Sequence, residues 1–177
     1  MLQQIATEPL LSTQIDKQIS FFLPGIARTK GSVTPILAAN GKGRVKPSSK
    51  HLKGWAEGCY FQAVNERNRA GICIAKGPVG LGLVVIIARP KCHFLANGSL
   101  RHDAPLFHIH PKDLDKIFRA LGDAFTGSLY RDDGQIVFGC QLKRWANPGE
   151  DPGVSVVYAT IREPHSYGEL LALQAAA

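Results

Sequence analysis

The sequence lacks the motifs that most often identify a hydrolase or a metal-binding module. It contains neither the Gly-x-x-x-x-Gly-Lys loop that cradles nucleotide phosphates nor the Gly-x-Ser-x-Gly turn that carries a nucleophilic serine. Its four cysteines form no Cys-x-x-Cys pair, so we expect no disulfide framework or zinc ribbon, but reduced, mostly buried thiols. The absences remove the usual sequence arguments for nucleotide hydrolysis and for nucleophilic catalysis by a side chain.

Long hydrophobic runs are also absent. The longest apolar run, residues 83–88, is far too short to span a bilayer, and no positively charged start leads into a long apolar segment. We therefore expect no membrane association and a cytoplasmic location. Between residues 92 and 110 one cysteine and four histidines offer enough ligands for zinc, but their spacing matches no zinc pattern. A polar loop with scattered histidines is the favoured interpretation of that stretch.

Length and composition predict one compact domain. A chain of 177 residues with 45% hydrophobic content can bury one core and is short for two. Residues 1–17 lack sustained periodicity, and residues 164–177 offer only a short apolar stretch. We expect a loosely ordered N-terminal segment at 1–17, a folded domain at 18–163 and a loosely attached C-terminal tail at 164–177.

Strand and helix patterns alternate irregularly along the chain, without a repeated βαβ unit. We therefore expect an α+β fold, in which two main helices pack on a mixed sheet. A helix capped by Ser48 or Ser49 should end near Gly71, and the run of Val, Ile and Leu after Val79 is typical of a central strand buried on both faces. The predicted strands are 19–23, 79–89, 135–145 and 154–161, with a hairpin pairing 33–37 with 44–46.

The second predicted helix carries the chemistry of greatest interest. Between residues 113 and 125, apolar residues recur at helical spacing and predict one buried stripe: Leu114, Ile117, Phe118, Leu121 and Phe125. Asp113 and Asp115 then project from the first turn, where the helix dipole favours anions. Arg119 follows on the helix, and Asp132 and Asp133 follow it within about twenty residues of Asp113. Such a carboxylate cluster suits a hard divalent cation.

The charge balance suggests a polyanionic partner. The chain carries 21 Lys and Arg against 14 Asp and Glu, a net charge of +7. Residues 28–53 hold seven basic residues and no carboxylate, so this stretch could bind phosphates, although a solvated basic hairpin explains it equally well. Within this stretch the basic residues predicted to contact nucleic acid are Arg28, Lys30, Lys42, Arg44 and Lys46.

The order and spacing of these motifs resemble those of the RusA-type Holliday junction resolvases. The resemblance covers roughly residues 19–161, and the segments that carry it are Lys112-Asp113-Leu114-Asp115-Lys116, Arg119, Asp123-Ala124-Phe125, Asp132-Asp133-Gly134-Gln135 and Lys143. It implies a homodimeric endonuclease that cuts four-way DNA junctions with Mg²⁺, or with Mn²⁺. It also implies that Asp113, Asp115 and Asp133 bind the metal, with Asp132 as a supporting carboxylate.

Two residues depart from the family pattern. Lys116 stands where the family has asparagine, and Arg119 stands at its catalytic lysine. An arginine cannot donate a proton near neutral pH, so we expect Arg119 to act electrostatically, by clamping phosphate or stabilising transition-state charge. Lys116 could bind phosphate or could partly neutralise the carboxylates. A catalytically weakened protein that still binds branched DNA is therefore the alternative function.

Simpler structural roles remain open for several of these residues. Asp113 could be only a helix N-cap, and Asp132-Asp133 only a turn before a strand. Asp123 is assigned a structural role, with Arg119 one turn earlier as its expected ion partner. Lys143 lies ten residues beyond Asp133, roughly 30 Å along a straight strand, so we expect it to contact DNA rather than the same metal. A metal-binding structural domain without nuclease activity is the third hypothesis.

Overall fold

The structure is a computed structural model, which describes residues 15–30, 34–37, 43–46, 51–110 and 113–163, with residues 166 and 168. Side chains within 34–37 and 43–46 are not part of this description. Most of the two expected terminal segments lie outside the described residues. The first described strand begins at Ile15, so residues 15–17 belong to the sheet rather than to a loose segment.

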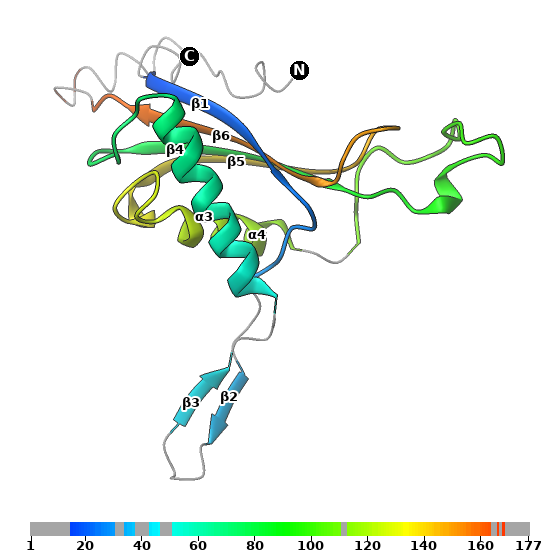
Figure 1. The fold of residues 1–177 in the computed structure, drawn as a ribbon, viewed down its shortest axis with the longest axis horizontal. Coiled ribbons are helices and arrows are strands. Elements are labelled where there is room, and N and C mark those ends of the chain that lie inside the picture. Colours follow the sequence, from blue (N-terminus) through cyan, green and yellow to red (C-terminus); the bar gives the residue numbers. More distant parts are fainter. Residues whose placement is uncertain are drawn as a thin grey trace.

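A four-stranded mixed sheet forms the centre of the domain (Figure 1). Its strands lie in the order β1, β6, β4, β5, and only the β4–β5 pair is parallel. The strands are β1 (Ile15–Pro24), β4 (Val79–Ile87), β5 (Ile136–Trp145) and β6 (Gly153–Ile161). The predicted strands are confirmed, and β4 is the central strand buried along nearly its whole length, as its sequence indicated.

Two helices, α3 (Leu52–Arg69) and α4 (Leu114–Phe125), pack on one face of this sheet and contact each other (Figure 1). The core lies between them and the sheet, where the ring of Phe21 from β1 meets Phe125 of α4 edge-on at 5.9 Å. Ile117, Leu121 and Phe125 are fully buried, so the predicted apolar stripe of α4 is confirmed. The α+β prediction is likewise confirmed.

A separate two-stranded antiparallel hairpin pairs β2 (Thr34–Leu37) with β3 (Gly43–Lys46) and stands beyond the N-terminal end of α3 (Figure 1). The hairpin was predicted, whereas the start of α3 was not. His51 occupies the N-cap position and makes no side-chain cap, so the predicted serine cap is wrong. Ser48 and Ser49 themselves lie outside the described residues.

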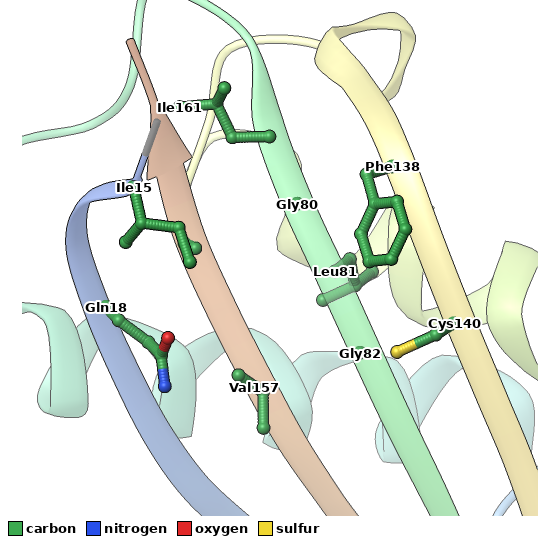
Figure 2. A pocket seen from close by; sticks show the side chains of 10 residues that line it. Ile15, Gln18, Gly80, Leu81, Gly82, Phe138, Cys140, Val157 and Ile161 are labelled. Carbon is green, nitrogen blue, oxygen red and sulfur yellow. The ribbon is translucent and has the colours of Figure 1, made fainter. Parts of the chain in front are cut away.

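The second face of the sheet lies opposite α3 and α4 (Figure 1), and the side chains around its pocket are mostly apolar, with Gln18 among them (Figure 2). Gly80 and Gly82 of β4 form the floor of a small pocket there, and Phe138, Cys140 and Val157 project around them. Antiparallel sheets usually turn polar side chains toward water on an open face. We call this surface the open sheet face.

The four cysteines are free, but the expectation that they are mostly buried is wrong. Only Cys59 of α3 is buried, where desolvation raises the pKa of its thiol to about 12. Cys140 is half-buried, and Cys73 and Cys92 are exposed. Among the described residues, no helix is long and apolar enough to cross a membrane.

Candidate functional site

An open cleft lies between α4 and the start of β5, with a volume of about 350 Å³. Its floor and walls include apolar groups from both elements, and its polar groups include two of the predicted carboxylates. The residues that line it are Asp115, Phe118, Arg119, Gly122, Asp133, Ile136 and Gln141. The fold therefore brings Asp115, Arg119 and Asp133 to one surface.

The geometry of α4 aligns the helical contribution to this cleft. Asp115, Arg119 and Gly122 follow one another at i, i+4 and i+7 and so lie along one side of the helix. The strand β5 runs past α4 in the opposite direction: Phe118 packs over Gly139, whose added Cβ would lie 2.8 Å from the ring, and Gly122 faces Ile136. A side chain at 139 would displace the Phe118 ring, so the glycine allows this ring to lie directly against the strand.

Asp133 reaches the cleft from a short 3-10 turn, η2 (Asp133–Gln135), that leads into β5. A reciprocal capping box fixes this turn: the Asp132 carboxylate accepts from the Gly134 N–H at 2.8 Å, and Gln135 Oε1 accepts from the Asp132 N–H at 3.0 Å. Gln135 Nε2 also donates to the Gly77 carbonyl at 2.7 Å, which ties the turn to the loop before β4. The Asp132 carboxylate is thus hydrogen-bonded within the turn, whereas Asp133 lines the cleft.

A buried tyrosine anchors the same corner to the helix. Tyr130 is fully buried, and its hydroxyl donates to the Gly122 carbonyl at 2.8 Å. Burial is the main cause that raises the pKa of Tyr130, and the nearby charge of Asp133 acts in the same direction. The last two turns of α4 and the Asp133 turn are therefore held together from the core side.

Asp113 is the predicted ligand that the cleft does not include. It occupies the N-cap position of α4, but its carboxylate makes no capping hydrogen bond. Lys116 Nζ donates to Asp113 Oδ2 instead, and this bond and the lysine charge hold the pKa of Asp113 below its usual value, with Lys143 adding to the effect. The residue that departs from the family pattern therefore engages one of the three predicted metal ligands.

The two cleft carboxylates stand at opposite ends of the cleft. A Cβ added to Gly122 would lie 4.0 Å from Asp133 Cβ, whereas Asp115 begins about 10 Å away along the helix axis, at about 1.5 Å per residue. Arg119 lies between them. Within the described residues, no three His, Cys, Asp or Glu side chains lie close enough together to hold a metal ion. The three predicted ligands therefore do not form a preassembled cage.

The chemistry of the cleft nevertheless fits Mg²⁺. Its polar donors are the oxygens of Asp115, Asp133 and Gln141, and neither histidine nor cysteine lines it. Mg²⁺ is commonly bound by one or two carboxylates, while water and substrate phosphates complete its octahedron. An ion here would be held by Asp115 or Asp133 together with oxygens of a bound phosphate. The soft and imidazole ligands that zinc favours are missing from this lining.

The predicted DNA contacts are spread over several surfaces. Lys30 pairs with Asp123 and, through its N–H, donates to the Lys116 carbonyl at 3.2 Å, so it braces α4. The expected Arg119 partner for Asp123 is thus replaced by Lys30. Arg28 is half-buried beside it. Arg44 and Lys46 belong to β3, and Lys42 lies outside the described residues.

Lys143 lies closer to the predicted site than a straight strand from Asp133 suggested. Its Nζ donates to the His110 carbonyl at 3.0 Å, and its charge helps to lower the pKa of Asp113. The strand does extend away from Asp133, but it runs antiparallel to α4 and so returns Lys143 to the Asp113 end. The sequence interpretation used only the distance from Asp133 along the strand. The position of α4 beside that strand could not be read from the sequence.

Sequence reasoning also missed Gln141, which strand alternation from Gly139 places on the helix-covered side of β5. Alternation along the predicted strand was the signal that could have identified it. Comparison of the chain with protein-family models and with curated protein sequences gives no match.

Proposed function

We propose that this protein is a Mg²⁺-dependent endodeoxyribonuclease that cuts four-way DNA junctions, as its resemblance to the RusA-type resolvases implies. The observation that carries the proposal is the cleft that Asp115, Arg119 and Asp133 line together. With DNA as its proposed substrate, we expect the protein to act in the cytoplasm. The net charge of +7 favours approach to DNA even though the cleft itself holds two carboxylates.

The residues of the cleft match the needs of phosphodiester hydrolysis. The scissile phosphate repels hydroxide, and its leaving oxygen acquires charge in the transition state. The chemistry that Mg²⁺ would supply, if bound here, is activation of a water molecule and stabilisation of that charge. Asp115 or Asp133 would hold the ion together with phosphate oxygens, and Arg119 between them would clamp the phosphate and offset developing negative charge. The contribution of Arg119 is electrostatic, rather than that of a proton donor.

The partner expected for a two-fold symmetric junction is a second copy of this chain, which supplies a second cleft. The open sheet face supports this expectation because its pocket is mostly apolar and none of the described residues lining it is charged. Each copy carries a net charge of +7, so contact through charged surfaces is unfavourable. Apolar sheet faces, in contrast, pack face to face about 10 Å apart. We propose that the homodimer forms through this face.

The second candidate function is a protein that binds branched DNA but has lost most catalytic power. The Lys116–Asp113 ion pair favours this candidate, since a carboxylate whose charge is offset by a lysine contributes less to holding a cation. The same pair would have to open for Asp113 to join a metal site with Asp115. The two candidates make the same prediction for binding and different predictions for cleavage.

One experiment separates these functions. The full chain is incubated with a labelled four-way junction and with a linear duplex of matched sequence, in Mg²⁺, in Mn²⁺ and in EDTA. Paired nicks restricted to the junction and abolished by EDTA are expected. Junction binding without nicks at any metal concentration would support the second candidate, and absence of junction binding would contradict both.

A further inference from the structure

Three large apolar side chains are exposed on one short segment beside the proposed active site. Leu106 and Phe107 are each 52% exposed, and Ile109 is 86% exposed. Exposed apolar side chains that gather in one place usually mark an interaction surface. The segment belongs to the loop of residues 88–110, which extends from the end of β4 well beyond the sheet before it returns to α4 (Figure 1).

The segment is built as a rigid edge. The Trp145 N–H donates to the Leu106 carbonyl at 3.0 Å, and Phe107 forms a bridge with Arg144 of β5. Arg89 connects this segment to the end of β5. Its guanidinium donates to the Pro105 carbonyl at 2.9 Å and to the Ala146 carbonyl at 2.6 Å. The backbone that carries the apolar side chains is thus hydrogen-bonded to the end of the sheet.

Alternation along this edge directs Phe107 and Ile109 outward. His108 between them is buried, and its ring packs against Trp145 with centroids 4.4 Å apart. In an extended segment, successive side chains point to opposite sides. Inward anchoring of His108 therefore fixes the two apolar neighbours on the solvent side, where the protein keeps them despite the cost of exposing them.

The edge lies at the Asp113 end of the proposed active site. Lys143 of β5 donates to the His110 carbonyl at 3.0 Å, and His110 lies three residues before Asp113 in the chain. Ile109 is four residues before Asp113, which limits their separation to about 14 Å even if the chain were fully extended. DNA whose backbone enters the cleft would therefore bring bases within reach of Phe107 and Ile109.

The charge of the surrounding loop suits nucleic acid better than an acidic or neutral protein surface. Residues 88–110 contain three basic side chains and one carboxylate. That carboxylate, Asp103, is held by the Arg101 guanidinium through two hydrogen bonds of 3.0 and 3.2 Å. Proteins that bind DNA in this way use basic side chains to contact phosphates and neighbouring apolar side chains to stack on bases or insert between them.

We propose that Phe107 and Ile109 form an apolar wedge that contacts bases exposed at the DNA branch point. The inference rests on the proposed function, since it assumes that branched DNA occupies the cleft. Linear duplex keeps its bases stacked and offers the wedge little to bind, whereas bases at a junction centre are easier to unstack. The wedge is therefore a determinant of preference for branched over linear DNA, separate from the residues that perform cleavage.

The test measures the affinities of the full chain for a fluorescent four-way junction and for a matched duplex in EDTA, where no cutting occurs. The double variant Phe107→Ala/Ile109→Ser is expected to bind the junction about tenfold more weakly, the scale of one lost base stack, with duplex affinity unchanged. Phe107→Trp, which keeps a stacking surface, should retain the preference. Phe61→Ala is the matched control, because Phe61 is 63% exposed on α3.

Equal losses on both DNAs, or no loss on either, would overturn the wedge. A double variant that changed the oligomeric state in sedimentation would assign the segment to contact with a second copy instead, and would also overturn it. Junction cleavage by the unmodified protein in Mg²⁺ is measured in parallel. If that protein cuts junctions while the variants keep its preference, the wedge alone fails. If it neither binds nor cuts junctions, the proposed function fails and the wedge fails with it.

Discussion

Replacement of Tyr130 by phenylalanine isolates the hydrogen bond that holds the Asp133 corner to α4. The ring stays in its buried site, and only the hydroxyl that donates to the Gly122 carbonyl at 2.8 Å is removed. Thr126 Oγ1 lies 3.3 Å from the same carbonyl, so the acceptor keeps a weaker partner. The expected loss is therefore about 1 kcal/mol in the free energy of unfolding, the net value of one such bond.

Urea denaturation followed by circular dichroism measures this loss, and at this chain length it corresponds to a fall of about 2–4 °C in Tm. Tyr158→Phe is the matched variant, because its buried hydroxyl donates to the Leu129 carbonyl at 3.0 Å. The two variants should lose similar stability. An unchanged Tyr130→Phe protein would refute the assigned bond, and a loss above about 3 kcal/mol would mean that Thr126 does not compensate.

Three further predictions concern charge, thiol chemistry and assembly. Glu150 accepts two 2.6 Å bonds from Arg144, which lower its pKa from the usual 4.5; that stability is present above pH 4.5 and lost as pH falls through the lowered pKa. Glu150→Gln should therefore lower the free energy of unfolding by about 1 kcal/mol at pH 7. Urea denaturation should show that this loss disappears in acid, and a loss independent of pH would contradict the ion pair. A thiol reagent at pH 8 should modify the two exposed cysteines at once and Cys59 only on unfolding, and rapid labelling of Cys59 in the folded protein would contradict its burial. Val157→Glu places a charge on the open sheet face and should convert dimer to monomer in sedimentation without unfolding the chain, whereas an unaltered dimer would exclude that face.

The fold was largely predictable because its elements carry strong local signals. The 3.6-residue periodicity of α4 and the continuous apolar run of β4 each depend only on neighbouring residues. The start of α3 could not be predicted, because its N-cap residue is a histidine without a side-chain capping bond rather than a serine. The exposure of Cys73 and Cys92 also lies beyond local pattern, since it depends on which loops the fold leaves uncovered.

The resemblance named Asp115, Arg119 and Asp133, and the structure shows that these three residues line one cleft. Their role in catalysis stays a prediction. The resemblance could not give the pairing of Asp113 with Lys116, because that contact depends on the lysine that departs from the family pattern. The return of Lys143 toward Asp113 was missed for another reason: it follows from the antiparallel passage of β5 along α4, which is a tertiary relation.

The most direct test of the account is single-turnover cleavage of a four-way junction in Mg²⁺ by Asp115→Asn and Asp133→Asn. Asp151→Asn is the control, since Asp151 is exposed in the β5–β6 connection outside the cleft. Both cleft variants are expected to cut about 100-fold more slowly or worse, to bind the junction as tightly as the unmodified protein, and to differ clearly from the control. Cleavage at the unmodified rate by either cleft variant would contradict the assignment of this cleft as the catalytic site.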